Sequence, residues 1–379
     1  MNTKELCDTI KAVKPFTALK STLPILGNVA VKLDEGGFRL EATNLEVACS
    51  VPVRSMGDGL TADIVTGFVQ LEKVVAALDC PALVIKDARE GYVYLSGDKT
   101  EVKLSCDGTG DWPALQTERG DTLLAITSAG VLRQVAERVA PSAANDMDRP
   151  SLMNVCAELR TGGALFVAVD GFELACLEVR QNGYYAGGDR EITLLIPATA
   201  LKPLVGLAVD DDEEVVLSAD LPKDGNPSLL RLHLESGRVG LVQLDTLSKF
   251  PDWRVIVPRN FAGSVTFDHK ALARAVKPLW ALAEKKNDVL FKTVMEITED
   301  GVVVSAKQQD GGSAEMRRDV AGAVVDGPPQ TIGISLARVE HLLKQAGKDV
   351  TMRYNEQHLS PALWDTGDGW TAVLMLMRI

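Results

Sequence analysis

The sequence lacks the long apolar stretch that a membrane-spanning helix needs. Its longest apolar runs are Ile192–Pro197 and residues 373–377, whereas a helix needs about 20 apolar residues to cross a bilayer. No apolar segment follows the N-terminal residues 1–5, as a secretory signal would require. We therefore expect a soluble protein of the cytoplasm.

Metal-binding and disulfide patterns are also missing. None of the six cysteines belongs to a C-x-x-C pair, and the four histidines show neither H-x-x-x-H nor H-E-x-x-H spacing. The cysteines stand mostly among apolar neighbours, which favours reduced thiols in the core over a metal or disulfide role. We expect no metal site and no cofactor.

Sequence patterns of common catalytic sites are absent too: G-x-x-x-x-G-K-[ST], G-x-S-x-G, and G-x-G-x-x-G between a strand and a helix. The glycine cluster at 107–111 could form a phosphate or calcium loop, but it lacks the third glycine and the following helix, so a turn is favoured. The acidic run at 210–214 could bind a cation, but a solvated connection between a helix and a strand is favoured. The sequence predicts a protein that is not an enzyme.

What the chain does contain is a large apolar fraction and an excess of acidic residues. With 379 residues and 46% apolar content, it can form two or three domains. The formal net charge of −12 disfavours indiscriminate binding to nucleic acid, because phosphate repulsion would dominate unless cations gather on one surface.

A strand, a glycine turn and a second strand recur three times, at 33–42, 159–168 and 297–306. Glycine supplies the positive φ that a tight hairpin needs, and the flanking alternation suits half-buried strands. The equivalent glycines lie about 126 and 138 residues apart, a period that fits repeated domains. We predict three α+β domains, at residues 1–118, 119–257 and 258–379.

Helical patterns follow the same period. Amphipathic segments begin near Thr3, Thr66, Thr127, Pro197, Phe267 and Ser335, so each domain holds two helices between strands. Thr66 is the N-cap candidate of the second helix, and Thr127 or Ser128 that of the third. Residues 222–228 form a predicted hairpin tip, and Asp111-Trp112-Pro113 and Phe250-Pro251-Asp252-Trp253 close the first two domains.

Cations on the polar faces of these helices are candidates for contact with DNA phosphates. For any single helix a solvated surface is the simpler interpretation, but recurrence in three domains could bring the cations to one surface. The candidates are Lys73, Arg133, Arg138, Lys202, Lys270, Arg274, Lys277 and Arg338.

Four segments have a distinctive wording: Thr22-Leu23-Pro24-Ile25-Leu26-Gly27-Asn28, residues 168–175, residues 250–253 and residues 374–379. In that order, they resemble the segments T-L-P-I-L-G-N, A-T-D-G-H-R-L-A, F-P-D-Y and the closing V-M-P-M-R-L of one known family. This family is the bacterial DNA sliding clamps, or β subunits of DNA polymerase III. The resemblance spans the whole chain.

This resemblance implies a head-to-tail homodimer of three-domain subunits, closed into a ring around double-stranded DNA without reading its sequence. Such a ring holds DNA by enclosure, so weak contacts suffice and a net negative charge is tolerated. The implied partners are the polymerase III α subunit, the clamp loader, other polymerases and repair proteins. The match also adds Lys20 and Arg149 to the candidate DNA contacts.

The resemblance further implies a cleft between the second and third domains that accepts short peptides from these partners. Its matching positions are mostly apolar and include adaptable methionines. They are Leu152, Val169, Gly171, Phe172, Leu174, Pro251, Ile256, His358, Ser360, Val373, Met375, Leu376, Met377 and Arg378. A purely buried final strand at residues 373–377 is the alternative.

Some positions depart from the family pattern. Phe172-Glu173 replaces its H-R, Leu376 replaces a proline, and Val255 stands where arginine is common. A second hypothesis is therefore a clamp paralogue that acts as a peptide-binding decoy or a drug-resistant substitute. At the implied subunit junction, Lys99, Val102 and Leu104 would meet Ala281 and Leu282.

Overall fold

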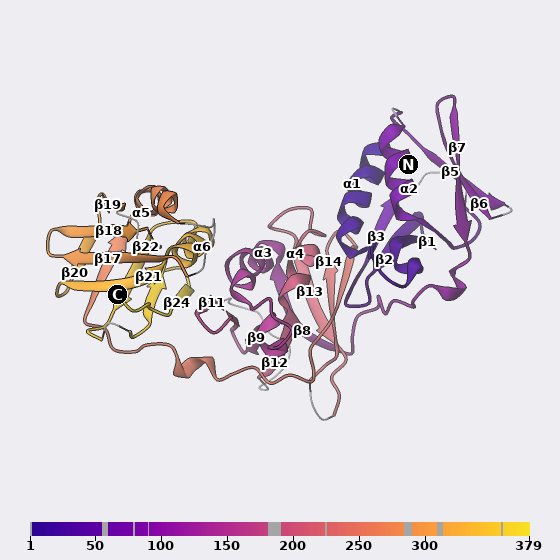
Figure 1. Cartoon of the computed structure of the whole chain (residues 1–379). Coiled ribbons are helices and arrows are strands. Elements are labelled where there is room, and N and C mark those ends of the chain that lie inside the picture. Colours follow the sequence, from indigo (N-terminus) through magenta and orange to yellow (C-terminus); the bar gives the residue numbers. More distant parts are fainter. Residues whose placement is uncertain are drawn as a thin grey trace. The chain divides into compact units, whose positions relative to one another are not determined.

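The computed structural model describes residues 2–54, 60–78, 80–89, 91–180, 191–223, 226–283, 290–308, 314–357 and 359–379 (Figure 1). The chain divides into two compact units, which are described separately. Unit 1 comprises Met1–Arg133, Leu159–Gly162 and Gly183–Thr246, and unit 2 comprises Gln134–Glu158, Gly163–Asn182 and Leu247–Ile379. The unit boundary passes through the predicted central domain, so the three domain boundaries stay a prediction.

Unit 1 contains one continuous antiparallel sheet with the strand order β5-β6-β7-β4-β1-β2-β3-β15-β14-β13-β8. These strands are β1 (Asn28–Asp34), β2 (Gly37–Thr43), β3 (Val47–Arg54), β4 (Ile64–Gly67), β5 (Val84–Arg89), β6 (Tyr92–Gly97), β7 (Thr100–Asp107), β8 (Thr122–Ser128), β13 (Glu214–Ala219), β14 (Leu229–Leu234) and β15 (Val239–Gln243). Unit 1 also holds β12 (Ile192–Pro197) and the helices α1 (Thr3–Val13), α2 (Phe68–Ala77) and α4 (Ala198–Val205). Helices α1 and α2 pack together.

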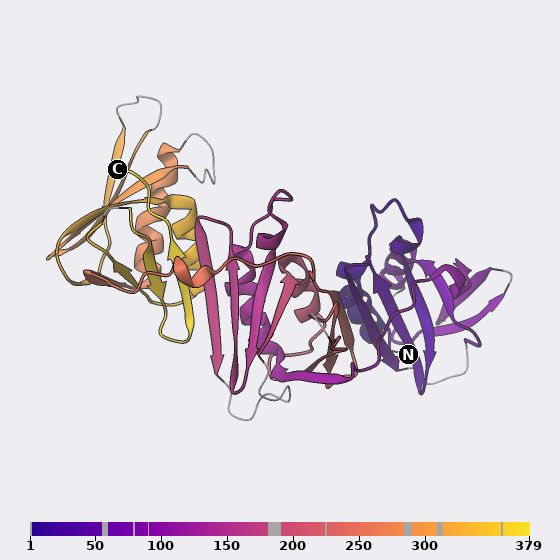
Figure 2. The same ribbon diagram turned by 90° about the horizontal axis from the view of Figure 1, so that it is seen from below.

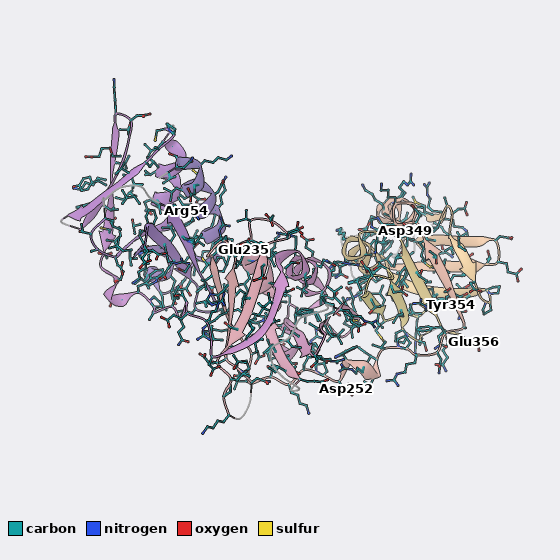
Figure 3. The ribbon with its side chains drawn as sticks, turned by 180° about the vertical axis from the view of Figure 1, so that it is seen from behind. Arg54, Glu235, Asp252, Asp349, Tyr354 and Glu356 are labelled. Carbon is teal, nitrogen blue, oxygen red and sulfur yellow. The ribbon has the colours of Figure 1, made fainter. Side chains whose placement is uncertain are left out.

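Unit 2 contains two sheets and the helices α5 (His269–Val276) and α6 (Leu336–Ala346), which contact each other and lie side by side in Figures 1 and 2. The larger sheet includes the order β10-β11-β24-β23-β22-β16-β20, and the smaller has the order β19-β18-β17-β21. The strands are β10 (Gly163–Val169), β11 (Glu173–Arg180), β16 (Gly263–Phe267), β17 (Lys292–Thr298), β18 (Gly301–Lys307), β19 (Glu315–Asp319), β20 (Val324–Asp326), β21 (Gln330–Ser335), β22 (Val350–Tyr354), β23 (Ala362–Asp365) and β24 (Trp370–Leu374). In Figure 3, the labels mark Asp349, which directly precedes β22, and Tyr354, the last residue of that strand.

Two elements cross from one unit to the other, α3 (Ala129–Arg138) and β9 (Asn154–Arg160). Short 3₁₀ helices occur as η1 (Lys14–Phe16), η2 (Pro24–Gly27), η3 (Thr109–Asp111), η4 (Ala140–Ser142), η5 (Pro150–Met153), η6 (Trp253–Val255) and η7 (Lys277–Leu282).

The three predicted glycine hairpins are confirmed as β1–β2, β9–β10 and β17–β18. Their turns contain Gly36 at φ +83°, Gly162 at φ +81° and Gly301 at φ +145°. These angles lie in the region that disfavours side chains, so the turn chemistry sets the positions of the repeat.

The helix starts agree with the sequence patterns to within two residues. Ser335 accepts a hydrogen bond from the Arg338 backbone N–H at the start of α6, as an N-cap does. The prediction for Thr66 was wrong: it lies in β4, and Gly67 is the N-cap of α2. For α3, Ser128 accepts a hydrogen bond from the Val131 backbone N–H at 3.4 Å.

Large aromatic side chains fill the interior of unit 2. Trp364, Trp370 and Phe267 are fully buried, and the rings of Phe267 and Trp364 stack with their centroids 5.9 Å apart.

The cysteines are free thiols, and Cys49, Cys106, Cys156 and Cys176 are buried, as expected. Within the described residues, no helix is both long enough and apolar enough to span a bilayer.

Candidate partner-binding cluster and basic side chains

A tight turn between β10 and β11 positions the first candidate binding residues. The Asp170 Oδ1 atom accepts hydrogen bonds from the backbone N–H groups of Phe172 and Glu173, each at 2.8 Å. Gly171 has a φ of +96°, and a Cβ there would lie 3.1 Å from the Arg149 Nη1 atom. The turn therefore favours glycine at 171 and presents Phe172, which is 58% exposed, to solvent.

Beside this turn lies an apolar cluster, here called the unit 2 cluster. Its buried members are Val167, Val169, Leu174, Cys176 and Val373. Partly buried hydrophobic side chains pack against them: Leu152, Leu165, Phe250, Trp253, Val257 and Leu363. The structure thus brings together Leu152, Val169, Leu174 and Val373, four residues of the predicted cleft.

Strand pairing explains how distant segments meet in the unit 2 cluster. In the antiparallel registers, Val373 of β24 lies opposite Leu174 of β11 on one side and Leu363 of β23 on the other. Directly paired residues project toward the same face of a sheet. Strand β11 and the neighbouring strands β23 and β24, which are far from it in the sequence, thereby form one apolar surface.

The C-terminal segment leaves the sheet after β24. Val373 and Leu374 are buried, whereas Met375 is 42% exposed and its backbone N–H donates to the Phe172 carbonyl oxygen at 2.9 Å. The Met377 N–H donates to the Gly333 carbonyl oxygen at 2.7 Å, and the Arg378 carbonyl oxygen accepts from Lys292. The final strand is therefore buried up to Leu374, and the residues after it are accessible at least in part.

The remaining cleft candidates lie in neighbouring loops. Pro251 and Ile256 are exposed and adjoin Phe250 and Val257 of the unit 2 cluster, and Leu376 is half-buried. Ser360 is half-buried and its hydroxyl contacts Gln357. His358 lies outside the described residues.

Sequence reasoning missed several members of the unit 2 cluster, among them Leu165, Leu363 and Val257. Leu363 lies in a strand whose burial alternates, so period-two patterning around Trp364 could have indicated it. Phe250 and Trp253 were recognised as domain-end residues but not as binding candidates.

A network of buried polar side chains holds Asp170 and Glu173 of the β10–β11 turn in place. The Glu173 side chain is 1% exposed and accepts hydrogen bonds from Ser142 at 2.6 Å, from Arg338 at 3.4 Å and from His341 of α6. Arg338 also pairs with Asp170 at 2.8 Å, and its guanidinium lies 5.2 Å from the Phe172 ring centroid. The departure at Glu173 is therefore matched by cationic and hydrogen-bonding partners.

A second network surrounds Asp368. Burial would raise the pKa of this carboxyl, but hydrogen bonds from Arg138, Thr366 and Lys348 hold its pKa far below the ordinary range. The Arg138 side chain is 12% exposed, bonds to both carboxylate oxygens and donates to the Gln345 carbonyl oxygen. Arg138 thus has a structural role in unit 2.

The candidate DNA-contacting cations differ in solvent exposure and in ion pairing. Arg338 and Arg138 are mostly buried in ion pairs, so both are left out of the set proposed below. Arg133 pairs with Asp211 at 2.6 Å and Arg149 with Asp146 at 3.0 Å. Among the described residues, the exposed candidates outside these ion pairs are Lys20, Lys73, Lys202, Lys270, Arg274 and Lys277.

Three of the exposed cations form a stripe. Lys270 and Arg274 belong to α5 and Lys277 begins η7, so their spacing of four and three residues brings them to neighbouring positions of one helical surface. Among the described residues, no acidic side chain forms a salt bridge with any of the three. This stripe, called the α5 stripe below, is a local concentration of unpaired positive charge in the described part of unit 2.

At the predicted subunit junction, Lys99 and Ala281 are exposed, and Val102 and Leu282 are half-buried. Leu104 is 6% exposed within the single chain, where it pairs with Val93 between β7 and β6. Its side chain belongs to the interior of unit 1, so a contact with another subunit would have to use its neighbours.

The acidic run at 210–214 is a structural connection. Burial would raise the pKa of Glu213, but hydrogen bonds from Ser236 and Val209 lower it overall, and Asp210 accepts from the Asp212 backbone N–H. Across the described ranges, no cluster of three His, Cys, Asp or Glu side chains is arranged to hold a metal ion.

Comparison with known proteins relates these features to one fold. No protein-family model matches the chain. The β sliding clamp of Vibrio cholerae is 23% identical over 372 residues, which cover 95% of this chain and 93% of that protein. The β sliding clamp of Synechocystis is 22% identical over 99% of this chain and 97% of its own length.

Solved structures agree along the whole chain. The DNA polymerase III β subunit of Thermotoga maritima matches with a TM-score of 0.85 and 21% identity, covering 100% of this chain and 98% of that one. The β subunit from Pseudomonas aeruginosa bound to griselimycin matches with a TM-score of 0.88 and 20% identity, over 100% and 98%. The fold is therefore the α+β DNA-clamp fold of three repeated domains, with helices packed on antiparallel sheets.

From one end to the other, the chain is similar in sequence and in fold to bacterial β sliding clamps, the β subunits of DNA polymerase III.

Proposed function

We propose that this protein is a DNA sliding clamp, a non-catalytic processivity subunit that encircles duplex DNA as a homodimeric ring. The observation that carries the proposal is the similarity to β sliding clamps over the full chain, in sequence and in fold. It would bind double-stranded DNA independently of the DNA sequence. Its protein partners would be the polymerase III α subunit, the clamp loader, other polymerases and repair proteins.

The charge distribution supports retention by enclosure. The chain carries a net charge of −12, and two of its candidate DNA-contacting arginines are neutralised internally. Tight adhesion to phosphates needs many free cations, because each contact adds counterion release. A closed ring needs few of them, and we assign weak phosphate contacts to the α5 stripe together with Lys20, Lys73 and Lys202.

The unit 2 cluster supports peptide docking. It combines an apolar surface with the exposed side chains of Phe172 and Met375 at its edge. Apolar anchors that enter such a surface supply most of the affinity of short peptides, and a flexible methionine adapts to different anchors. We assign the capture of clamp-binding peptides to this cluster and the C-terminal residues 375–378.

Retention on DNA circles tests the proposal. The protein is loaded with a bacterial clamp loader and ATP onto nicked circular DNA, and bound protein is separated by gel filtration before and after the circle is linearised. We expect retention on the circle and loss from the linear form. Equal retention on both forms would contradict enclosure.

A matched pair of variants tests ring closure. Ala281 is exposed at the predicted junction and Ala321 is exposed in a turn elsewhere in unit 2. Ala281→Asp is expected to shift sedimentation toward the monomer and to abolish retention on circles, because it introduces a charge into a subunit contact. Ala321→Asp is expected to leave both unchanged.

A further inference from the structure

Unit 1 contains a cavity of about 200 Å³ that the proposed function does not use. It lies beside the β2–β3 turn, the segment 113–116, and the ends of β14 and β15. Its lining includes Leu45, Glu46, Leu115, Leu229, Leu241 and Gln243. We call it the unit 1 groove.

The turn at the unit 1 groove has the same construction as the turn at the unit 2 cluster. The Asn44 Oδ1 atom accepts hydrogen bonds from the backbone N–H groups of Glu46 and Val47, at 2.9 and 2.8 Å. The Asn44 N–H donates to the Val47 carbonyl oxygen at 3.1 Å, as the Asp170 N–H does to Glu173 at 3.1 Å. Asn44 in unit 1 therefore corresponds to Asp170 in unit 2.

Neighbouring strands repeat the correspondence. The Gln243 N–H donates to the Glu46 carbonyl oxygen at 2.8 Å, and the Met375 N–H donates to the Phe172 carbonyl oxygen at 2.9 Å. Leu241 pairs with Ala48 just as Val373 pairs with Leu174. The segment after Trp112-Pro113 lines the groove, and the residues around Phe250-Pro251 pack against the unit 2 cluster.

The unit 1 groove and the unit 2 cluster both have a floor of buried apolar side chains. In unit 1, Ala48, Val239 and Leu241 form a buried cluster, and Leu115 and Leu229 pack against it. Since the chain is built from repeated domains, the unit 1 groove is the counterpart of the candidate peptide-binding surface. It retains the backbone geometry and the apolar floor.

The side chains at the rim of the unit 1 groove differ from those at the edge of the unit 2 cluster. Glu46 stands where unit 2 has Phe172, and Gln243 stands where unit 2 has Met375. Within the described residues, no cation pairs with the exposed Glu46 carboxylate. The rim of the unit 1 groove is thus more polar than the rim of the unit 2 cluster, and it is negative.

The backbone conformation of Leu45 is a further, independent indication of a ligand site at the unit 1 groove. It occupies the position of Gly171, has a φ of +75° and is 50% exposed at the groove. The left-handed conformation disfavours a side chain such as leucine, and residues held this way concentrate at ligand sites. The strained leucine places an apolar side chain at the rim, where glycine would leave none.

We propose that the unit 1 groove is a second peptide-docking site, which takes an extended segment with one short aliphatic side chain followed by a lysine or arginine. The aliphatic side chain rests on Leu115, Leu229 and Leu241, and the cation pairs with Glu46. A volume of about 200 Å³ suits one such side chain and its adjoining backbone.

Methyl-resolved NMR of the full-length protein tests the proposal. The probes are acetyl-Gly-Val-Lys-Gly-Ser-amide and the same peptide with glutamate in place of lysine. The methyl signals of Leu45, Leu115, Leu229 and Leu241 report the groove. Those of Val169, Leu174 and Val373 report the unit 2 cluster, so the two sites are distinguished in one titration.

Two exposed carboxylates provide the variant and its control. Glu46→Lys is expected to weaken binding of the lysine peptide roughly fivefold and to favour the glutamate peptide, as reversal of a rim charge does. Glu35→Lys makes the same charge change in the β1–β2 turn, roughly 20 Å away at the other end of β2. It is expected to leave binding unchanged.

The outcomes decide the proposal. Shifts of the four leucine methyls by the lysine peptide, lost in Glu46→Lys and kept in Glu35→Lys, support it. Three results overturn it: no shift at these leucines, shifts confined to the unit 2 cluster, or equal responses to the two peptides.

Discussion

Replacing Arg338 by methionine removes the cation that stands between Asp170 and Glu173. The substitution keeps much of the apolar stem, so lost packing is small. Glu173 is 1% exposed and would keep its contacts with Ser142 and His341, but it would lose its only arginine partner among the described residues. Asp170 would lose a 2.8 Å ion pair at the same time.

The magnitude follows from burial and geometry. Breaking a fully buried ion pair costs about 3–5 kcal/mol, since it leaves an uncompensated charge. Arg338 is 18% exposed and its contact with Glu173 is 3.4 Å long, so solvent screens part of the loss. We expect Arg338→Met to lower the free energy of unfolding of unit 2 by about 2–3 kcal/mol.

Tryptophan fluorescence in urea measures this loss where it occurs. Trp253, Trp280, Trp364 and Trp370 all lie in unit 2, and Trp112 is the single tryptophan of unit 1. The fluorescence transition therefore reports mainly the unfolding of unit 2. The expected result is a lower urea midpoint with an unchanged slope.

A double-mutant cycle separates the ion pair from other effects. Glu173→Gln removes the buried charge and keeps the shape, so we expect a cost of about 1 kcal/mol. In Glu173→Gln combined with Arg338→Met, the loss should be smaller than the sum by about 1 kcal/mol, because no buried charge remains unpaired. Full additivity would refute the coupling, as would a loss no larger than in the exposed control Arg180→Met.

Four further predictions follow from the described contacts. The pKa of Asp368 is depressed, so its carboxylate stabilises unit 2 above about pH 4, and this contribution is lost as the pH falls further. Asp368→Asn should therefore flatten the dependence of the urea midpoint on pH below about 4. An equally steep loss of stability in acid in the variant would argue against this role. Burial raises the pKa of the Cys156 thiol to about 12, so a thiol reagent at pH 8 should modify it only on unfolding, which mass spectrometry of the labelled peptide checks. Met377→Asp should abolish peptide capture with little loss of dimer, because it puts a charge beside an apolar surface; unchanged affinity by fluorescence anisotropy would mean that the docking surface lies elsewhere. Arg274→Glu should shorten the lifetime on circular DNA and lessen its salt dependence, and an unchanged lifetime at low salt would remove the α5 stripe from the DNA contacts.

Local features of the fold could be predicted from the sequence because their signals are local. Gly36, Gly162 and Gly301 have positive φ values that few other residues tolerate, so they indicated the hairpins directly. Helix starts followed from apolar periodicity and were correct to within two residues. The error at Thr66 arose because a threonine at the end of a strand looks like an N-cap until the strand pairing is known.

The electrostatic partners of the site could not be predicted, because they lie far apart in the sequence. Arg138 and Asp368 are 230 positions apart, and Arg338 and Asp170 are 168 positions apart. Each looks like an exposed charge on its own element, and pairing depends on the tertiary structure. The burial of Leu104 within unit 1 could not be predicted either, since a strand pattern alone does not tell which face is covered.

The charge arrangement around Phe172 bears on which peptides the unit 2 cluster would select. The family pattern has an arginine where this chain has Glu173, yet Arg338 of α6 brings a guanidinium to within 5.2 Å of the Phe172 ring centroid. That cation faces two carboxylates, Asp170 and Glu173, so the group of three carries a net negative charge when His341 is neutral. A peptide with an acidic residue beside its apolar anchor would meet uncompensated negative charge here, and in a half-buried site this repulsion is weakly screened by salt. Selection at this surface should therefore favour neutral or basic residues next to the anchor, and that preference would come from Glu173 while the apolar contacts stay those of the family.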